Sequence, residues 1–359
     1  MSERHMKPLS EKEIIDLFVR KFKNLGLTQT TDLIRRQYFS AARVGTDDVA
    51  IITIDRGLKK GVKLIFKCDM LVESTDVPPG MRPWQVARKS IVSCVSDFSA
   101  KGIKPIYTSL LSIGFPEKYT KSEVLDLLRG FEISSGEFGI NFVGGDTNKS
   151  NELIIDCGMI GFSESESIPS RDGAGPGDYI VVSGVFGYPA AGLKILIQGA
   201  KAEKKFKQQA ISSVFRPRPQ QKFGISLARY FSSSIDSSDG LATSLYELAI
   251  QSKVNFFITR IPSVEAVEYF ASNNSLIDRD ELIFYGGEEY HIVATIPSRN
   301  MKRLISVVKK LKLKMIVIGR VSKGDGKVFV QRSIGKETSF ELLENRGYLH
   351  LIGDHERKQ

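Results

Sequence analysis

Short β-branched and apolar runs alternate with segments of helical periodicity, and one polar stretch interrupts this alternation. The apolar runs at 47–54, 62–70, 106–115 and 152–162 are typical of buried strands. Between them, a segment with Pro83 at its first turn predicts a helix whose apolar face is formed by Trp84, Ala87, Ile91, Val95 and Phe98. The interrupting stretch, "SESESIPSRDGAGPG" at 163–177, is rich in loop-forming residues. We therefore predict an α/β (α+β) chain with two domains, residues 1–162 and 163–359.

The 359-residue chain carries 51 Lys and Arg against 41 Asp and Glu, a formal net charge of +10. This charge permits an anionic partner, but the basic residues are spread along the sequence, so we expect no nucleic-acid partner. The cysteines Cys68, Cys94 and Cys157 form no CxxC pair, which favours a reducing compartment. The N-terminal residues contain no apolar core of the signal-peptide type, and no run of about 18 apolar residues could span a membrane. We expect a cytoplasmic protein without membrane association.

Acidic residues recur at the ends of predicted strands and helices, several of them beside Gly or Ser. They are Asp48, Asp69, Asp97, Asp146, Asp236 and Asp239, with Asp76 a little beyond Asp69. Each alone is explained by a helix cap or a turn. Together they indicate a metal site, because Mg²⁺ takes carboxylate oxygens and completes its shell with water and phosphate oxygens. The pattern predicts several Mg²⁺ ions around a polyphosphate.

Glycine-rich segments accompany these acids. Two glycines precede Asp146 in "VGGDTN", and three more follow Arg171 in "RDGAGPGD". Backbone N–H groups in such turns can face phosphate oxygens, and an arginine adds paired hydrogen bonds to a phosphate. The usual nucleotide signatures, a zincin motif and a nucleophile elbow are missing. The four histidines are His5, His291, His350 and His355, and they do not have the spacing of a zinc site. We expect each of them at the surface or in the core with its hydrogen bonds satisfied.

Seven segments carry a resemblance to a known family: "GTDDVA", "CDMLVEST", "VSDFSAKG", "FVGGDTN", "RDGAGPGD", "IDSSDGL" and "GGEEYHI". In this order they resemble the motif series of the thiamine-monophosphate kinase family, within the aminoimidazole ribonucleotide synthetase superfamily. The resemblance covers about residues 30 to 350. It implies a homodimer formed through the sheet of the N-terminal domain. It also implies ATP and thiamine monophosphate as substrates, with several Mg²⁺ ions between them.

The resemblance implies roles for individual residues as well. The implied metal ligands are Asp48, Asp69, Asp97, Asp146, Asp236 and Asp239. Nucleotide contacts are implied for Gly145, Asp146, Arg171 and Ser238, and a direct part in catalysis for Asp97, Asp146 and Arg171. Contacts with the thiamine substrate are implied for Glu288 and Tyr348, and we expect Asp76 near the same acceptor.

The sequence departs from the family pattern at three places. Asp76 stands where members often have a histidine, and Lys67 and Cys68 replace a Ser/Thr pair before the metal-binding Asp69. Lys67 thereby brings a positive charge next to the metals. The third departure is "GGEEYHI" in place of "GEDYEL". Two alternatives stay open: an ATP-dependent ligase like aminoimidazole ribonucleotide synthetase, and a non-catalytic phosphate- or nucleic-acid-binding module.

A phosphate acceptor changes what catalysis requires. A phosphate monoester has a second pKa of about 6, so its oxygen is mostly deprotonated near neutral pH. Such an acceptor needs in-line positioning and cations, whereas an alcohol needs a general base. We therefore predict direct transfer without a phosphoenzyme, and little activity on unphosphorylated thiamine.

Overall fold

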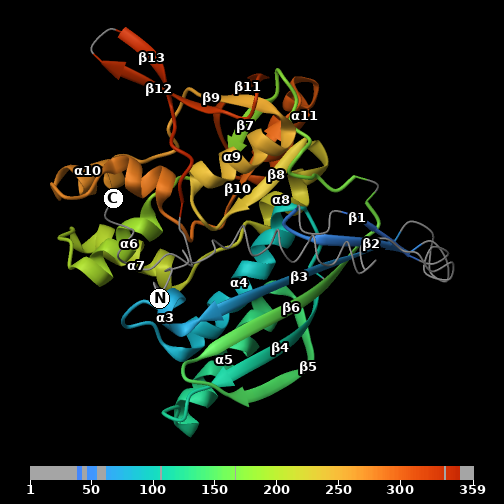
Figure 1. Cartoon of the computed structure of the whole chain (residues 1–359), viewed down its shortest axis with the longest axis vertical. Coiled ribbons are helices and arrows are strands. Elements are labelled where there is room, and N and C mark those ends of the chain that lie inside the picture. The colour runs from blue at the N-terminus through green and yellow to red at the C-terminus, as the bar shows by residue number, and fades with distance from the viewer. Residues whose placement is uncertain are drawn as a thin grey trace, which may run out of the picture.

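The computed structural model describes residues 39–42, 47–54, 62–105, 107–165, 167–334 and 337–347. Within these ranges the chain forms two β-sheets with helices packed on them (Figure 1). The strands of the first sheet end at Ser163, and those of the second begin at Tyr179. This arrangement confirms the mixed α/β class, while the exact domain limits stay a prediction. Tyr348, His5, His350 and His355 lie outside the described residues.

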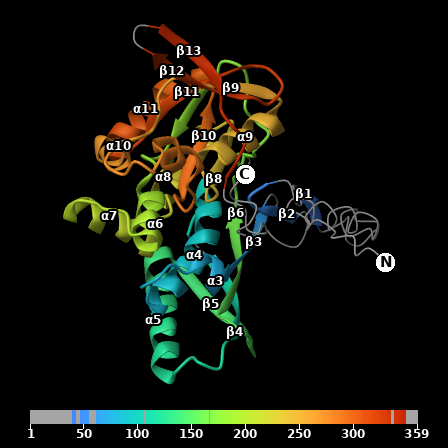
Figure 2. The ribbon, with the colours of Figure 1, turned by 60° about the vertical axis from the view of Figure 1, so that its left-hand side comes forward.

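The first sheet has six strands in the order β1-β2-β3-β6-β4-β5. Neighbouring strands are antiparallel except for the parallel pair of β4 and β5. The strands are β1 (Phe39–Ala42), β2 (Ala50–Ile54), β3 (Lys63–Val72), β4 (Tyr107–Phe115), β5 (Ile140–Lys149) and β6 (Ile154–Ser163). The helices of this half are α3 (Glu73–Asp76), α4 (Pro83–Ala100) and α5 (Lys121–Phe138). Figure 2 shows α4 and α5 on one face of the sheet, and no described helix covers the other face.

Helix α4 is the central element of the molecule. It begins at Pro83, as predicted, and the Gln85 side chain accepts the N–H of Arg82 at 2.9 Å. Glycines on two neighbouring helices allow close contact with it. A Cβ on Gly130 of α5 would lie 2.2 Å from the Trp84 carbonyl oxygen. One on Gly224 of the later helix α8 (Gln221–Leu227) would lie 1.7 Å from the Ser99 carbonyl oxygen.

The second sheet has seven strands in the order β13-β12-β9-β11-β7-β10-β8. They are β7 (Tyr179–Val182), β8 (Ser233–Ser237), β9 (Val254–Ile258), β10 (His291–Ile296), β11 (Ile316–Lys323), β12 (Val328–Ile334) and β13 (Glu337–Leu342). The helices are α6 (Tyr188–Gln198), α7 (Lys204–Phe215), α8 (Gln221–Leu227), η1 (Ala228–Tyr230), α9 (Leu241–Ser252), α10 (Glu265–Ser272), η2 (Glu281–Tyr285) and α11 (Ser298–Leu311).

Both faces of this second sheet are covered. Ile180 and Val182 of β7 pack into an apolar cluster with α6 and α9, whereas Val181 between them packs with α8 and α11. This alternation follows from the two-residue period of a strand. Ala100, the last residue of α4, belongs to the second of these clusters. Helix α4 therefore connects the core of the first sheet with that of the second.

The structure corrects the expected position of two acids at element ends. Asp69 lies inside β3, which continues to Val72, and Asp146 lies inside β5. The glycines before Asp146 are part of this edge strand: Gly144 has φ 152°, and a Cβ on Gly145 would lie 1.9 Å from the Leu111 carbonyl oxygen. They suggested a turn, but here they permit close pairing with β4.

In the part of the chain that the structure describes, none of the helices has the length and apolar character needed to cross a membrane.

Candidate functional site

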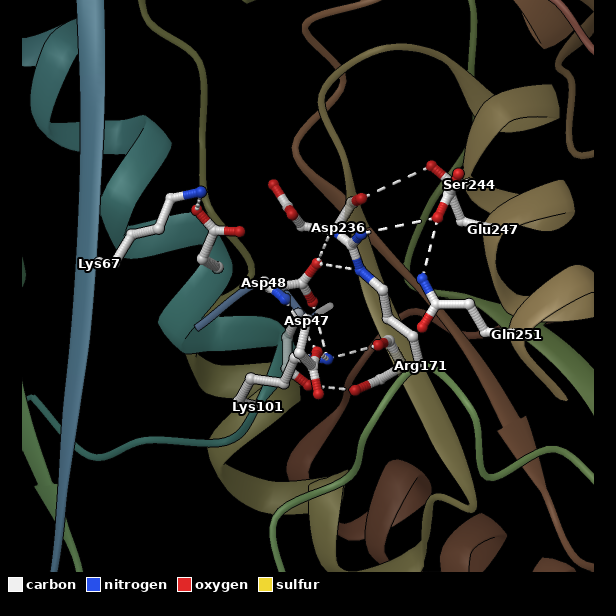
Figure 3. Close-up of polar contacts among 12 residues, drawn as sticks. Asp47, Asp48, Lys67, Lys101, Arg171, Asp236, Ser244, Glu247 and Gln251 are labelled. Carbon is white, nitrogen blue, oxygen red and sulfur yellow. Dashed lines mark hydrogen bonds and ion pairs between the residues drawn. The ribbon is translucent and has the colours of Figure 1, made fainter. Parts of the chain in front are cut away.

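Three buried carboxylates meet where α4 contacts the second sheet. Asp48 lies just before β2, Asp97 lies near the end of α4, and Asp236 lies on β8. One oxygen of each carboxylate lies within 4.8 Å of the others. Figure 3 shows Asp48 beside Asp236, with basic side chains around them. The fold thus brings together three of the predicted metal ligands, although they come from distant parts of the sequence.

Lys101 holds Asp48 in position through a buried ion pair. This residue caps the end of α4, and its side chain is fully buried. Its Nζ lies 2.7 Å from Asp48 Oδ2 and 2.6 Å from Asp47 Oδ1, and it donates a 2.6 Å hydrogen bond to the Ser234 carbonyl. One ammonium group therefore ties α4 to β8 and to the segment before β2.

Arg171 pairs with the same aspartate from the stretch between the sheets. Its Nε donates to Asp48 Oδ1 at 2.8 Å and its Nη2 contacts the same oxygen, while Nη1 lies 3.7 Å from Glu247 Oε2. Burial alone would raise the pKa of Asp48, but Lys101 and Arg171 outweigh it and hold this pKa below its usual value. Asp48 is therefore ionised and firmly positioned.

Lys67 reaches the cluster from β3. Its Nζ lies 2.9 Å from Asp97 Oδ2 and 3.2 Å from Asp69 Oδ1. Lys67 and Asp69 are two residues apart on one strand, so both side chains face α4. The predicted metal ligand Asp69 is thereby linked to Asp97 through a lysine.

The carboxylates of Asp97 and Asp236 are crowded. Burial raises the pKa of Asp97 well above its usual value; Lys67 opposes this shift, and the charges of Asp236 and Asp69 add to it. Burial, with the charge of Asp48, raises the pKa of Asp236 to about 6. Both shifts express the cost of holding negative charges close together away from water. A bound cation would relieve that cost.

Two of the predicted substrate residues meet at a buried lysine. Lys89 of α4 donates to the Asp76 carbonyl at 2.6 Å and forms an ion pair with Glu288. The Asp76 carboxylate accepts the Val72 N–H at 2.7 Å and thereby closes the short helix α3. Asp76 thus positions its own turn, while Lys89 connects that turn to the segment carrying Glu288.

The segment 286–290 joins two groups of residues. One is the acidic cluster of Asp48, Asp97 and Asp236, and the other is the Lys89 group of Lys89, Asp76 and Glu288. Glu288 and Tyr290 have φ values of 65° and 51°, which are unusual for residues with side chains. Burial raises the pKa of the Tyr290 hydroxyl well above its usual value, and the charges of Glu288 and Asp69 add to the shift. Tyr290 therefore lies within the field of the acidic cluster and of the Lys89 group together.

Gly145 and Asp146 lie elsewhere. The strand register pairs Asp146 with Ser112, Ser112 with Asp156, and Asp156 with Met70. Paired residues share a face, so Asp146 lies on the face of exposed Met70, opposite to α4. Within one chain, Asp146 is therefore separated from Asp69 and Asp97 by the sheet itself.

Ser238 and Asp239 lie in the turn between β8 and α9. The Ser238 carbonyl accepts the Glu288 N–H at 2.6 Å, which joins this turn to the segment 286–290. Asp239 is half-buried beside Ser238 and is not one of the three clustered carboxylates.

Sequence reasoning missed Lys101, Lys89 and Tyr290. Lys101 stands in the quoted motif "VSDFSAKG", but a lysine at a helix end reads as an ordinary C-terminal cap. Lys89 lies within the predicted helix after Pro83, and Tyr290 lies within the motif "GGEEYHI". Neither residue belongs to a pattern of charges in the sequence that would indicate a site. The signal that identifies all three is burial of a polar group beside acids, which appears only in the folded chain.

Residues 46–163 match the family "AIR synthase related protein, N-terminal domain". A protein named thiamine-monophosphate kinase from Nitrosopumilus maritimus is 39% identical, over 96% of this chain and 100% of that protein. One of the same name from Pyrococcus horikoshii is 31% identical, over 97% of this chain and 98% of the relative. A solved structure described as "AaThiL complexed with AMPPCP and TMP" has a TM-score of 0.78 and 27% identity, over 97% of this chain and 100% of the other.

Proposed function

Because this chain belongs to the thiamine-monophosphate kinase family, we propose that it transfers the γ-phosphoryl group of ATP to thiamine monophosphate. The products are thiamine diphosphate and ADP. The observation that carries the proposal is the full-length match to kinases of that name. A related structure that holds an ATP analogue and TMP supports both substrates.

The acidic cluster supports Mg²⁺ as the metal of this reaction. Asp48, Asp97 and Asp236 offer hard carboxylate oxygens close together, and the raised pKa values of Asp97 and Asp236 express an unmet demand for positive charge. We assign these three and Asp69 to Mg²⁺, with Asp239 next to the site. When bound, Mg²⁺ would offset the charge of the phosphate oxygens.

Arg171 supplies a cation beside Asp48 of the cluster. Its side chain is partly exposed while it pairs with Asp48, so its guanidinium can turn toward a phosphate without leaving the site. Paired N–H donors suit a phosphate oxygen pair. We assign Ser238, in the turn directly after the strand β8 that carries Asp236, to the same nucleotide.

The acceptor side is assigned to the Lys89 group. Glu288 lies on the segment 286–290 next to Tyr290, and Lys89 fixes its carboxylate. A carboxylate here suits the cationic thiazolium or the aminopyrimidine of the substrate. Asp76 shapes the adjoining turn, and Tyr348 remains assigned to the same moiety.

The transfer proceeds without a general base. His291, the histidine within the described residues, donates Nε2–H to the Val185 carbonyl at 3.0 Å, and its Nδ1 accepts the Ser183 hydroxyl at 3.2 Å. Burial lowers its pKa to about 4, so it is neutral and engaged in the core. The phosphate acceptor is already deprotonated near neutral pH. The residues of the site thus orient two anions and neutralise them.

We further propose a homodimer formed through the uncovered face of the first sheet. Large apolar side chains are exposed there: Met70 (63%), Leu110 (52%), Val143 (62%) and Phe162 (45%). An apolar face of this kind is typical of a subunit interface. Asp146 lies on this face and Gly145 precedes it on the edge strand β5, so we propose that their metal and nucleotide roles serve the site of the partner subunit.

The cytoplasm is the proposed location. The three cysteines are free thiols, and Cys94 and Cys157 are buried near one another without a disulfide. Free thiols are typical of a reducing compartment.

An ADP-release assay tests the activity. Thiamine monophosphate, thiamine and formylglycinamidine ribonucleotide are each offered with ATP and Mg²⁺. We expect turnover with thiamine monophosphate only, and none from an Asp97→Asn control. Activity on the ribonucleotide alone would establish the ligase alternative, and comparable activity on thiamine would refute the base-free mechanism.

A further inference from the structure

Lys67 lies between two of the predicted metal ligands, Asp69 and Asp97, on the β3 side of the acidic cluster. Its Nζ lies 2.9 Å from Asp97 Oδ2 and 3.2 Å from Asp69 Oδ1. The Asp97 side chain is only 7% exposed, so few water molecules share this position with the ammonium group. Figure 3 shows Lys67 reaching the cluster from β3, on the side opposite to Arg171.

The strand fixes this placement. Lys67 pairs with Met159 of β6, in the middle of an uninterrupted ten-residue register between β3 and β6. The two-residue strand period puts Lys67 and Asp69 on the face toward α4. The lysine cannot leave that face without a change of register, so only its flexible stem can move.

The charges of the site show what Lys67 contributes. Five carboxylates surround the site, those of Asp47, Asp48, Asp69, Asp97 and Asp236. Three cations face them, Lys67, Lys101 and Arg171. With all five carboxylates ionised, as a bound divalent ion would favour, five negative against three positive charges leave two negative charges, which that ion balances. Without Lys67, three negative charges would remain, and Asp69 and Asp97 would have no cation between them.

We propose that the Lys67 ammonium group permanently occupies a cation position between Asp69 and Asp97, in place of a divalent ion. This inference rests on the proposed function, since it concerns the metals that serve phosphoryl transfer. The chain consequently binds one divalent ion fewer than the same set of aspartates would bind without the lysine. An oxygen-bearing residue at position 67 would open the position to a metal, because hard cations take oxygen ligands and not ammonium groups.

Counting Mn²⁺ ions tests the proposal without any assay of activity. The full chain is titrated with Mn²⁺ in the absence of nucleotide, and free Mn²⁺ is measured by electron paramagnetic resonance. The variants are Lys67→Ser, which adds a hydroxyl ligand, and Lys67→Gln, which keeps more of the side-chain volume. Lys63→Ser is the matched control, since it removes a lysine from the same face of the same strand, where it contacts the Ser165 carbonyl.

We expect Lys67→Ser and Lys67→Gln to bind one more Mn²⁺ per chain than the wild type, and Lys63→Ser to bind the wild-type number. Circular dichroism identifies any variant that fails to fold, and the other neutral variant then gives the count. An unchanged number in a folded variant overturns the proposal. An unchanged number with tighter binding also overturns it, because Lys67 would then compete for an existing metal position. A wild type that does not phosphorylate thiamine monophosphate contradicts the proposed function and leaves the ion count to decide about Lys67.

Discussion

Lys101 Nζ lies 2.7 Å from Asp48 Oδ2, and both side chains are fully buried. Asp48 belongs to the three-carboxylate cluster, while Lys101 follows α4 directly. The pair therefore joins the structure of the N-terminal half to the geometry of the site.

Lys101→Met should destabilise the protein strongly. The change leaves Asp47 without its buried ammonium partner and Asp48 with Arg171 alone. Breaking a buried ion pair by removing one partner costs about 3–5 kcal/mol. Urea denaturation measures the loss, and Lys104→Met, at an exposed lysine three residues along, serves as the control. Equal stability of the two variants would contradict the structural role of Lys101.

Asp97→Asn and Asp146→Asn should each lower activity by orders of magnitude while leaving the fold intact. Asp97 lies in the cluster and Asp146 on the opposite face of the sheet, so the proposed dimer supplies them from different subunits. Dissociating and mixing the two inactive variants should then restore activity. With random pairing, half of the dimers are mixed and each has one intact site, so about a quarter of wild-type activity is expected. If mixed dimers form and no activity returns, Asp97 and Asp146 of the same subunit serve the same site, which contradicts the prediction.

Lys89→Met should weaken binding of the acceptor and not of ATP. The Glu288 carboxylate loses its ion-pair partner, and the turn at Asp76 loses the hydrogen bond to its carbonyl. We expect the KM for thiamine monophosphate to rise roughly tenfold, which corresponds to about 1.4 kcal/mol. The KM for ATP should change little. Lys118→Met, at an exposed lysine paired with Glu73, is the control; equal rises in both KM values for Lys89→Met would contradict the assignment.

Glu289→Gln should change how stability depends on pH. Glu289 accepts the Gly187 N–H, and burial raises its pKa from 4.5 to about 8. The folded state therefore favours the protonated acid, and wild-type stability falls as the pH rises from about 4.5 through about 8, by at most about 1.4 kcal/mol per pH unit. Glutamine keeps the acceptor oxygen and does not titrate.

The stability advantage of Glu289→Gln should accordingly grow between pH 5 and pH 8 and level off above. Nearby His291, 3.9 Å from Glu289, is present in both proteins, so its own titration largely cancels. Thermal melts across this pH range supply the comparison. Parallel wild-type and variant curves would show that Glu289 is ionised throughout.

Met70→Glu combined with Leu110→Glu should dissociate the proposed dimer. Both side chains lie on the uncovered face of the first sheet, and a charge there would be buried on association. Sedimentation should show a wild-type dimer at micromolar concentration and a monomeric variant. Leu276→Glu, at a 99% exposed leucine of the other half, is the control. A wild-type protein that sediments as a monomer would contradict the proposed homodimer.

The sequence alone determined the local elements and the family. Pro83 and the apolar spacing that follows specify α4, because helix initiation and an apolar face depend on neighbouring residues. The motif series identified the kinase family for the same reason: residue types in a fixed order are visible without coordinates. The residue types grouped Asp48, Asp97 and Asp236 with three further acids as metal ligands, and that assignment stays a prediction.

Only the tertiary structure decided which acids meet and which cations face them. Asp69 and Asp146 looked alike in the sequence, but the register of β3, β6, β4 and β5 places them on opposite faces of one sheet. A shift of one residue reverses the face of a strand residue, and that register is set by long-range pairing. Likewise, Lys101 and Lys67 became part of the site because α4 packs between two sheets and buries their ammonium groups beside carboxylates. Burial and pairing of charges depend on contacts between distant segments, which the order of residues does not display.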